Sequence, residues 1–211
     1  MDVSSSLVQR PRAWPNLAFI GGGLLMAVMW MRFTTLHGPT SFNEDGHWLG
    51  GSGIFWGGMI GFASLLIVLG LYGHRILWAR RGGRLARIGY WLTMIGLGVP
   101  AVVELAVRAP MPPLLMPLAA TGLILLATAH RHDPSLPPTS RVALLAMGIL
   151  LSVAFLMAAA IPLETFDSIQ GYRLYGILSN VFFGLGCVVL GASLARHPMA
   201  ELTPPTVTEA A

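Results

Sequence analysis

The sequence predicts an all-α integral membrane protein with six transmembrane helices arranged as three hairpins. Composition is the first reason: 55% of the 211 residues are hydrophobic and only 10% are charged, whereas a soluble domain carries about 25% charged residues. The second reason is that the apolar residues fall into blocks of about 20, the length with which a helix crosses the hydrocarbon core of a bilayer. Continuous blocks of this length do not fit a membrane β-barrel, whose strands alternate over about ten residues.

The apolar blocks define the expected helices in chain order. The first block follows two arginines but has no signal-peptidase site after it, so we expect an uncleaved helix. The fourth block is the shortest, because Pro112, Pro113 and Pro117 crowd its start. The blocks cover residues 14–33, 49–73, 88–107, 113–129, 142–162 and 174–195.

The arginines predict the orientation of these helices. Ten of the thirteen lie in or beside the N-terminus, the second and fourth connections and the C-terminus, and an excess of arginine marks the cytoplasmic side. We therefore expect residues 1–13 as a cytoplasmic segment, residues 14–197 as the transmembrane domain and residues 198–211 as a disordered cytoplasmic tail. The expected location is a cell membrane, such as a bacterial inner membrane, and the bilayer is the first expected partner. Nucleic acid is not expected as a partner, because the basic residues are explained by topology.

Two segments on the other side resemble each other. The stretch SFNEDGHWLGG (41–51) aligns with TFDSIQGYRLYG (165–176) when one residue is inserted. The resemblance indicates a parallel pseudo-repeat that relates helices 1–2 to helices 5–6, a type of repeat found in transporters. The alternative is chance similarity in a sequence rich in glycine, phenylalanine and leucine.

The glycines between residues 47 and 61 are better suited to helix packing than to phosphate binding. Their spacing differs from the dinucleotide fingerprint, and neither a preceding strand nor the required acidic residue is present. Gly53, Gly57 and Gly61 recur every four residues, and Ser64 continues this stripe at the next turn. Such small residues open one helix face to close approach by a neighbour. Gly184 belongs to a similar stripe in the sixth block. We expect helices 2 and 6 to pack against each other, or one of them to contact another membrane protein or a second copy of the chain.

Polar residues within the apolar blocks are the first candidates for function, because ionisable groups are costly in a membrane. Glu104 lies near the outer end of the third block, and Arg108 follows at the spacing of an i,i+4 pair. Arg32 ends the first block at a similar depth. Asn180 lies on the small-residue stripe of the sixth block. Each also has a structural interpretation, as an interfacial ion pair or as a hydrogen bond between helices.

The outer loops carry histidine and carboxylate residues, among them His47 and Asp167. No pair of them has a diagnostic metal-binding spacing, so we expect no metal and no cofactor, and solvated loop residues are the simpler interpretation. The one cysteine, Cys187, excludes a disulfide within the chain.

Three classes of function are compatible with these observations. The first is a non-enzymatic accessory protein, scaffold or small subunit, which the packing stripes favour. The second is a transporter or binder of a small or apolar molecule, with an outward-facing cavity near Glu104 that Arg32, Arg108, Asn180 and His47 would help to form. The third is a membrane-embedded enzyme on a lipid or isoprenoid, in which Glu104 or Asp167 would act as a general acid. The sequence leaves open whether the protein is an enzyme.

Overall fold

The computed structural model describes residues 13–36, 47–48, 51–80, 82–108, 113–160 and 174–197. The predicted flanking segments 1–13 and 198–211 therefore lie outside the described residues, apart from Ala13. The elements in chain order are α1 (Trp14–Leu36), β1 (His47–Trp48), β2 (Gly51–Ser52), α3 (Gly53–Gly73), α4 (Arg75–Arg80), α5 (Gly83–Val107), η1 (Pro113–Leu115), α6 (Met116–Ala129), α7 (Pro138–Ala160), η2 (Ile177–Phe182) and α10 (Phe183–Arg196).

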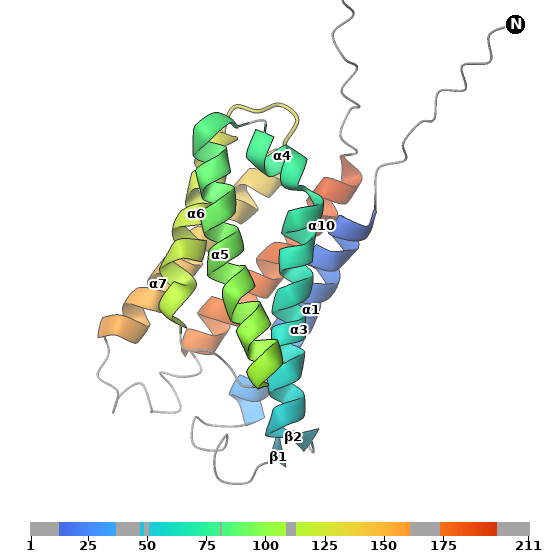
Figure 1. Cartoon of the computed structure of the whole chain (residues 1–211), viewed down its shortest axis with the longest axis vertical. Coiled ribbons are helices and arrows are strands. Elements are labelled where there is room, and N and C mark those ends of the chain that lie inside the picture. The colour runs from blue at the N-terminus through green and yellow to red at the C-terminus, as the bar shows by residue number, and fades with distance from the viewer. Residues whose placement is uncertain are drawn as a thin grey trace, which may run out of the picture.

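The long helices form a closed ring in the order of the chain (Figure 1). Each long helix packs against the next one, from α1 through α3, α5, α6 and α7 to α10, and α10 closes the ring by packing on α1. The short helix α4 packs against α5 at one end of the bundle, and the antiparallel pair β1–β2 precedes α3 at the other end. We call these the arginine end, which carries Arg75, Arg84, Arg87, Arg131, Arg141 and Arg196, and the hairpin end.

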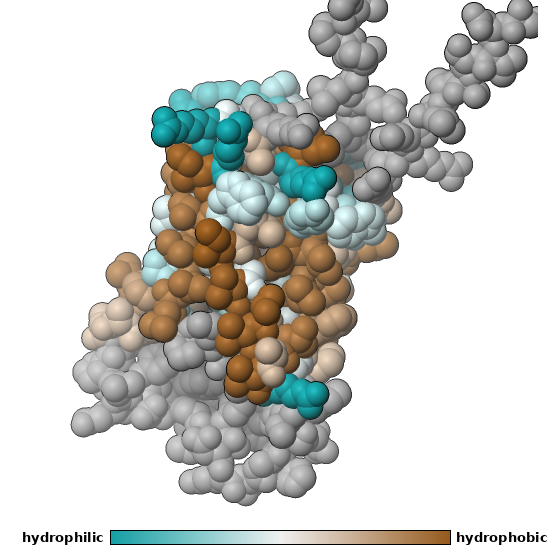
Figure 2. Space-filling view, in the orientation of Figure 1, coloured by the Kyte–Doolittle hydropathy of each residue, from teal (hydrophilic) through white to brown (hydrophobic). Residues whose placement is uncertain are grey.

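The face of the ring seen in Figure 2 is mostly apolar along the helices. Figure 2 shows hydrophobic residues along the helices, with hydrophilic residues gathered at the arginine end. Within the described part of the chain, four helices are long and apolar enough to cross a membrane, namely Trp14–Met31, Gly83–Val107, Pro138–Ala160 and Leu174–Arg196. Two shorter apolar helices, Gly58–Gly73 and Pro113–Ala129, complete the ring. The chain therefore has the architecture of a helical membrane protein.

The predicted blocks match the helices in order but not at every end. The block at 49–73 is wrong at its start, because Trp48 pairs with Gly51 and His47 with Ser52 before α3 begins at Gly53. The third and fifth helices begin earlier than the apolar blocks do, at Gly83 and Pro138. Proline suits a first helical position because the missing amide would have no partner there.

Glycines set the closest helix contacts, but not between the helices we expected. Helices α3 and α10 both pack on α1, which lies between them. The expected packing of helices 2 and 6 against each other is therefore wrong. The run Gly21–Gly23 in α1 explains the arrangement: a Cβ on Gly22 would lie 2.8 Å from the Ala63 carbonyl oxygen in α3, and one on Gly23 would overlap the Gly184 carbonyl oxygen in α10.

The two predicted stripes have different neighbours in the ring. A Cβ on Gly61 would lie 2.5 Å from the Leu105 amide nitrogen, so α3 packs there on α5. A Cβ on Gly184 would lie 2.5 Å from the Gly23 carbonyl oxygen in α1. Gly53 and Gly57 lie in the first turns of α3. The structure does not describe the surroundings of these two positions.

Candidate ligand cavity

The ring of helices contains a partly open cavity of about 350 Å³ near the hairpin end. Pockets for small ligands in proteins have volumes of about 300–1,000 Å³ and are mostly apolar, with a few polar groups that fix orientation. Every long helix contributes to the lining. The residues are Met26 and Trp30 from α1, Ile60, Ser64 and Ile67 from α3, Gly96, Leu97, Pro100 and Glu104 from α5, Pro113, Leu115, Met116 and Ala119 from η1 and α6, Leu151 from α7, and Tyr175, Ser179, Asn180 and Phe183 from the last helix.

Glu104 is the carboxyl-bearing residue among the described lining residues. It is 9% exposed, and it lies three residues before the hairpin end of α5. The hydroxyl of Ser64 in α3 donates a hydrogen bond to Oε2 of Glu104 at 3.4 Å. A carboxyl group at this depth needs hydrogen-bond partners, because burial without them is costly.

Pro100 lies in α5 one turn before Glu104 and also lines the cavity. It lies inside the helix and, together with Gly96 and Glu104, lines the cavity at four-residue intervals. Proline has no amide hydrogen, so the Gly96 carbonyl group does not receive the helical hydrogen bond from position 100. This face of α5 therefore combines an interrupted backbone with a buried carboxyl group.

The side of the cavity across from α5 includes a π-helical turn. Residues 177–182 form this wider turn at the start of the last helix, and π-helical turns are frequent at functional sites. The hydroxyl of Ser179 donates to the Tyr175 carbonyl oxygen at 2.7 Å, and Nδ2 of Asn180 donates to Oγ of Ser179 at 2.7 Å. Tyr175, Ser179, Asn180 and Phe183 all line the cavity.

The cavity has a polar part and an apolar part. Along α5 the lining runs from Glu104 to Gly96, which at 1.5 Å per residue is a length of about 12 Å. Glu104, Ser64 and Asn180 give polar atoms to the part nearer the hairpin end. The deeper part is walled by apolar groups, namely Ile67, Gly96, Leu97, Ala119 and Phe183.

The predicted site residues are divided between the cavity and other places. Glu104 and Asn180 line the cavity together. Arg108 is exposed and caps α5 in a left-handed conformation (φ 56°), and the described residues contain no ion pair between it and Glu104. Leaving the helical conformation removes the i,i+4 geometry on which the expected pair depends.

The remaining predicted residues cannot be located at the cavity. Arg32 lies in α1 and His47 in β1, but their side chains are outside the described features, and Asp167 lies in the undescribed range 161–173. The loop segments that suggested a pseudo-repeat are also mostly outside the described residues.

Sequence reasoning missed several polar lining residues. Ser64 was expected to continue a packing stripe, yet its hydroxyl bonds to Glu104. Ser179 and Tyr175 were not singled out. The available signal was the four-residue spacing of Tyr175 and Ser179, which places these two residues on the same face of a helix.

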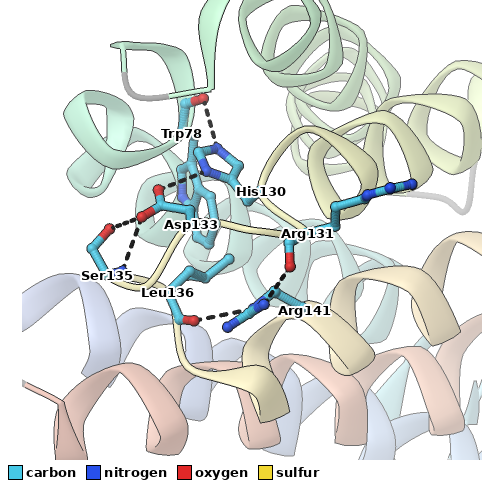
Figure 3. A network of polar contacts seen from close by, with 7 residues as sticks. All are labelled: Trp78, His130, Arg131, Asp133, Ser135, Leu136 and Arg141. Carbon is cyan, nitrogen blue, oxygen red and sulfur yellow. Dashed lines mark hydrogen bonds and ion pairs between the residues drawn. The ribbon is translucent and has the colours of Figure 1, made fainter.

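A second polar cluster lies at the arginine end, where α6 turns into α7 (Figure 3). Nδ1 of the fully buried His130 contacts Oδ2 of Asp133 at 3.2 Å, and its Nε2 lies 3.4 Å from the Trp78 carbonyl oxygen. Both partners can accept a hydrogen bond from a ring nitrogen of His130. Burial by itself would raise the pKa of Asp133, but hydrogen bonds from the Ser135 hydroxyl and amide and from His130 together lower it.

This cluster has a structural role. The guanidinium group of Arg141 donates to the Leu136 carbonyl oxygen at 3.1 Å and to the Arg131 carbonyl oxygen. These bonds fix the connection across which α7 packs back on α6 (Figure 3). We find no group of three metal-binding side chains among the described residues.

Acidification is expected to destabilise the protein through His74, at the turn between α3 and α4. Nε2 of this buried ring donates to Oδ1 of Asn16 in α1 at 2.7 Å, and burial lowers the pKa of His74 from 6.5 to about 4. The folded state therefore binds this proton less readily than the unfolded state does. Stability should be complete above pH 6.5 and fall between pH 6.5 and 4, by a few kcal/mol (~3).

The thermal unfolding temperature of the purified protein, measured across this pH range, tests the expectation. His74→Gln is the control, because its amide can still donate to Asn16 but does not titrate. A wild-type profile that matches the His74→Gln profile would show that His74 is not responsible.

Comparison with protein-family models, with curated proteins and with solved structures found no match to this chain. The interpretation of the cavity therefore depends on its own geometry and chemistry.

Proposed function

We propose that the protein binds a small, mainly apolar molecule in the cavity of its helix ring. One observation carries the proposal: Glu104 and Asn180, which are polar residues of two different apolar helices, line the same cavity of about 350 Å³. A scaffold or accessory subunit, which the sequence favours, has no need of such a cavity in its centre. Close packing of the interior would be the more stable arrangement.

We further propose that all six helices cross the membrane, with both termini on the cytoplasmic side. The support is that the arginines gather at one end of the bundle, because cytoplasmic ends of membrane helices are enriched in arginine. In this orientation the cavity lies nearer the outer face. A parallel pseudo-repeat of helices 1–2 and 5–6 remains part of the proposal, supported by the similar segments 41–51 and 165–176.

Filling the cavity tests the proposed function. Leu97→Trp places a larger side chain into the apolar part of the cavity, whereas Leu105→Trp on the same helix adds the same side chain at an exposed position. Each protein is purified from its native membrane, and the small molecules that it retains are extracted and compared by mass spectrometry. We expect wild type and Leu105→Trp to retain a common compound that Leu97→Trp has lost.

Identical compounds in identical amounts from wild type and Leu97→Trp would contradict binding in the cavity. Glu104→Gln gives a second measurement, because it keeps the shape of the side chain and removes its charge. A hydrogen bond to a charged group contributes about 1.5–3 kcal/mol, so we expect retention to fall by roughly ten- to a hundredfold.

A further inference from the structure

We infer that the molecule bound in the cavity is a compact amphiphile whose polar head donates hydrogen bonds, as a hydroxyl or amino group does. The inference rests on the proposed function, because it specifies the ligand of the same cavity. The inference is supported by the directions of the hydrogen bonds around Ser179 in the last helix and at Glu104 in α5.

The last helix presents a hydrogen-bond acceptor to the cavity, because the direction of each hydrogen bond around Ser179 is fixed. The Ser179 hydroxyl has one hydrogen, and that hydrogen goes to the Tyr175 carbonyl oxygen, which can only accept. Ser179 must therefore accept from Asn180, and this requires the amide nitrogen of Asn180, not its oxygen, to face Ser179. The amide oxygen Oδ1 then points away from Ser179 on a side chain that lines the cavity.

Glu104 in α5 also presents hydrogen-bond acceptors to the cavity. An ionised carboxylate has about four lone-pair sites and no hydrogen to donate. The Ser64 hydroxyl donates one hydrogen bond to Glu104, at 3.4 Å. A head group between Asn180 and Glu104 is therefore recognised if it carries hydrogen on oxygen or nitrogen. An anionic head such as a carboxylate has no hydrogen to donate to Oδ1 of Asn180 or to the Glu104 carboxyl group and is disfavoured.

The apolar part limits the rest of the molecule. A cavity of about 350 Å³ lies near the lower end of the range for small-ligand pockets, which is about 300–1,000 Å³, so it suits a small molecule with one hydrocarbon chain or one ring. The ligand class is therefore a single-chain or single-ring alcohol or amine, with its head toward the hairpin end and its tail toward Leu97 and Phe183.

Photolabelling with a matched series of probes tests this inference. The probe is a decanol that carries a diazirine on its chain, added to the purified protein in nanodiscs, and the labelled residues are mapped by mass spectrometry. Unlabelled decanol, decylamine, decyl methyl ether and decanoate are then compared as competitors. Decanol and decyl methyl ether differ in the ability of the head to donate a hydrogen bond.

We expect the label on cavity residues such as Met26 and Met116, with decanol and decylamine competing at concentrations at least about tenfold lower than the ether and decanoate. Asn180→Leu should reduce the advantage of decanol over the ether, whereas Leu105→Trp should preserve it. Equal competition by alcohol and ether, or strongest competition by decanoate, would overturn the donor head while leaving the cavity a binding site. If the wild-type cavity residues are not labelled at all, the proposed function itself fails.

Discussion

Replacing Trp78 with alanine is expected to lower the free energy of unfolding by about 3–5 kcal/mol, the usual cost of removing a large buried aromatic side chain. Trp78 in α4 is 0% exposed. Its ring meets His74 and His130 edge-on, with centroid separations of 6.3 and 6.1 Å. It therefore joins the α3–α4 turn to the end of α6, and its loss leaves a cavity between them.

Trp78→Phe is the matched control. Phenylalanine keeps an aromatic ring and removes the indole Nε1–H, which is buried without a hydrogen-bond partner among the described residues. Removing an unsatisfied donor offsets part of the lost packing, so the cost should be clearly smaller than for alanine. The free energy of unfolding in mixed micelles, measured by titration with a denaturing detergent, distinguishes the two variants. Equal losses for both would contradict the packing role.

Gly23→Ala is expected to lower stability by about 1–3 kcal/mol, the range for inserting atoms into a well-packed interior. A Cβ at Gly23 would overlap the Gly184 carbonyl oxygen and would lie 3.0 Å from Cβ of Cys187. These atoms belong to backbone or to a fully buried side chain, so they cannot move away without separating α1 from α10. The same unfolding titration measures the effect.

Gly21→Ala is the control in the same helix. A Cβ there would have no atom within 4 Å, and alanine favours a helix over glycine by up to about 1 kcal/mol. The expected order of stability is therefore Gly21→Ala at or above wild type, with Gly23→Ala below it. A Gly23→Ala protein as stable as Gly21→Ala would show that α1 and α10 do not approach as closely as the structure has them.

Composition could predict the helices because the bilayer requires long apolar segments with internally bonded backbones. It could not predict their ends. Arg84 and Arg87 lie inside α5, because backbone hydrogen bonds continue past the apolar block. The hairpin at His47–Ser52 depends on pairing between backbone groups, which hydropathy does not record.

The candidate site could be predicted only as single residues. Glu104 and Asn180 stand out because polar groups are rare in apolar blocks, but their common cavity exists only once the ring has formed. The partners of the glycine stripes depended on ring order, which places α1 between α3 and α10. The π-helical turn that brings both Ser179 and Asn180 to the cavity has no periodic signal in the sequence.

The closure of the ring has a consequence for how the protein is made. Helices enter the membrane in the order of synthesis, and each packs on the one before it, except that α10 must also reach back to α1. The wall carrying Tyr175, Ser179 and Asn180 arrives with this last helix. Without this last helix the ring is an open groove, so the proposed binding of a ligand in the cavity requires the last helix to be in place.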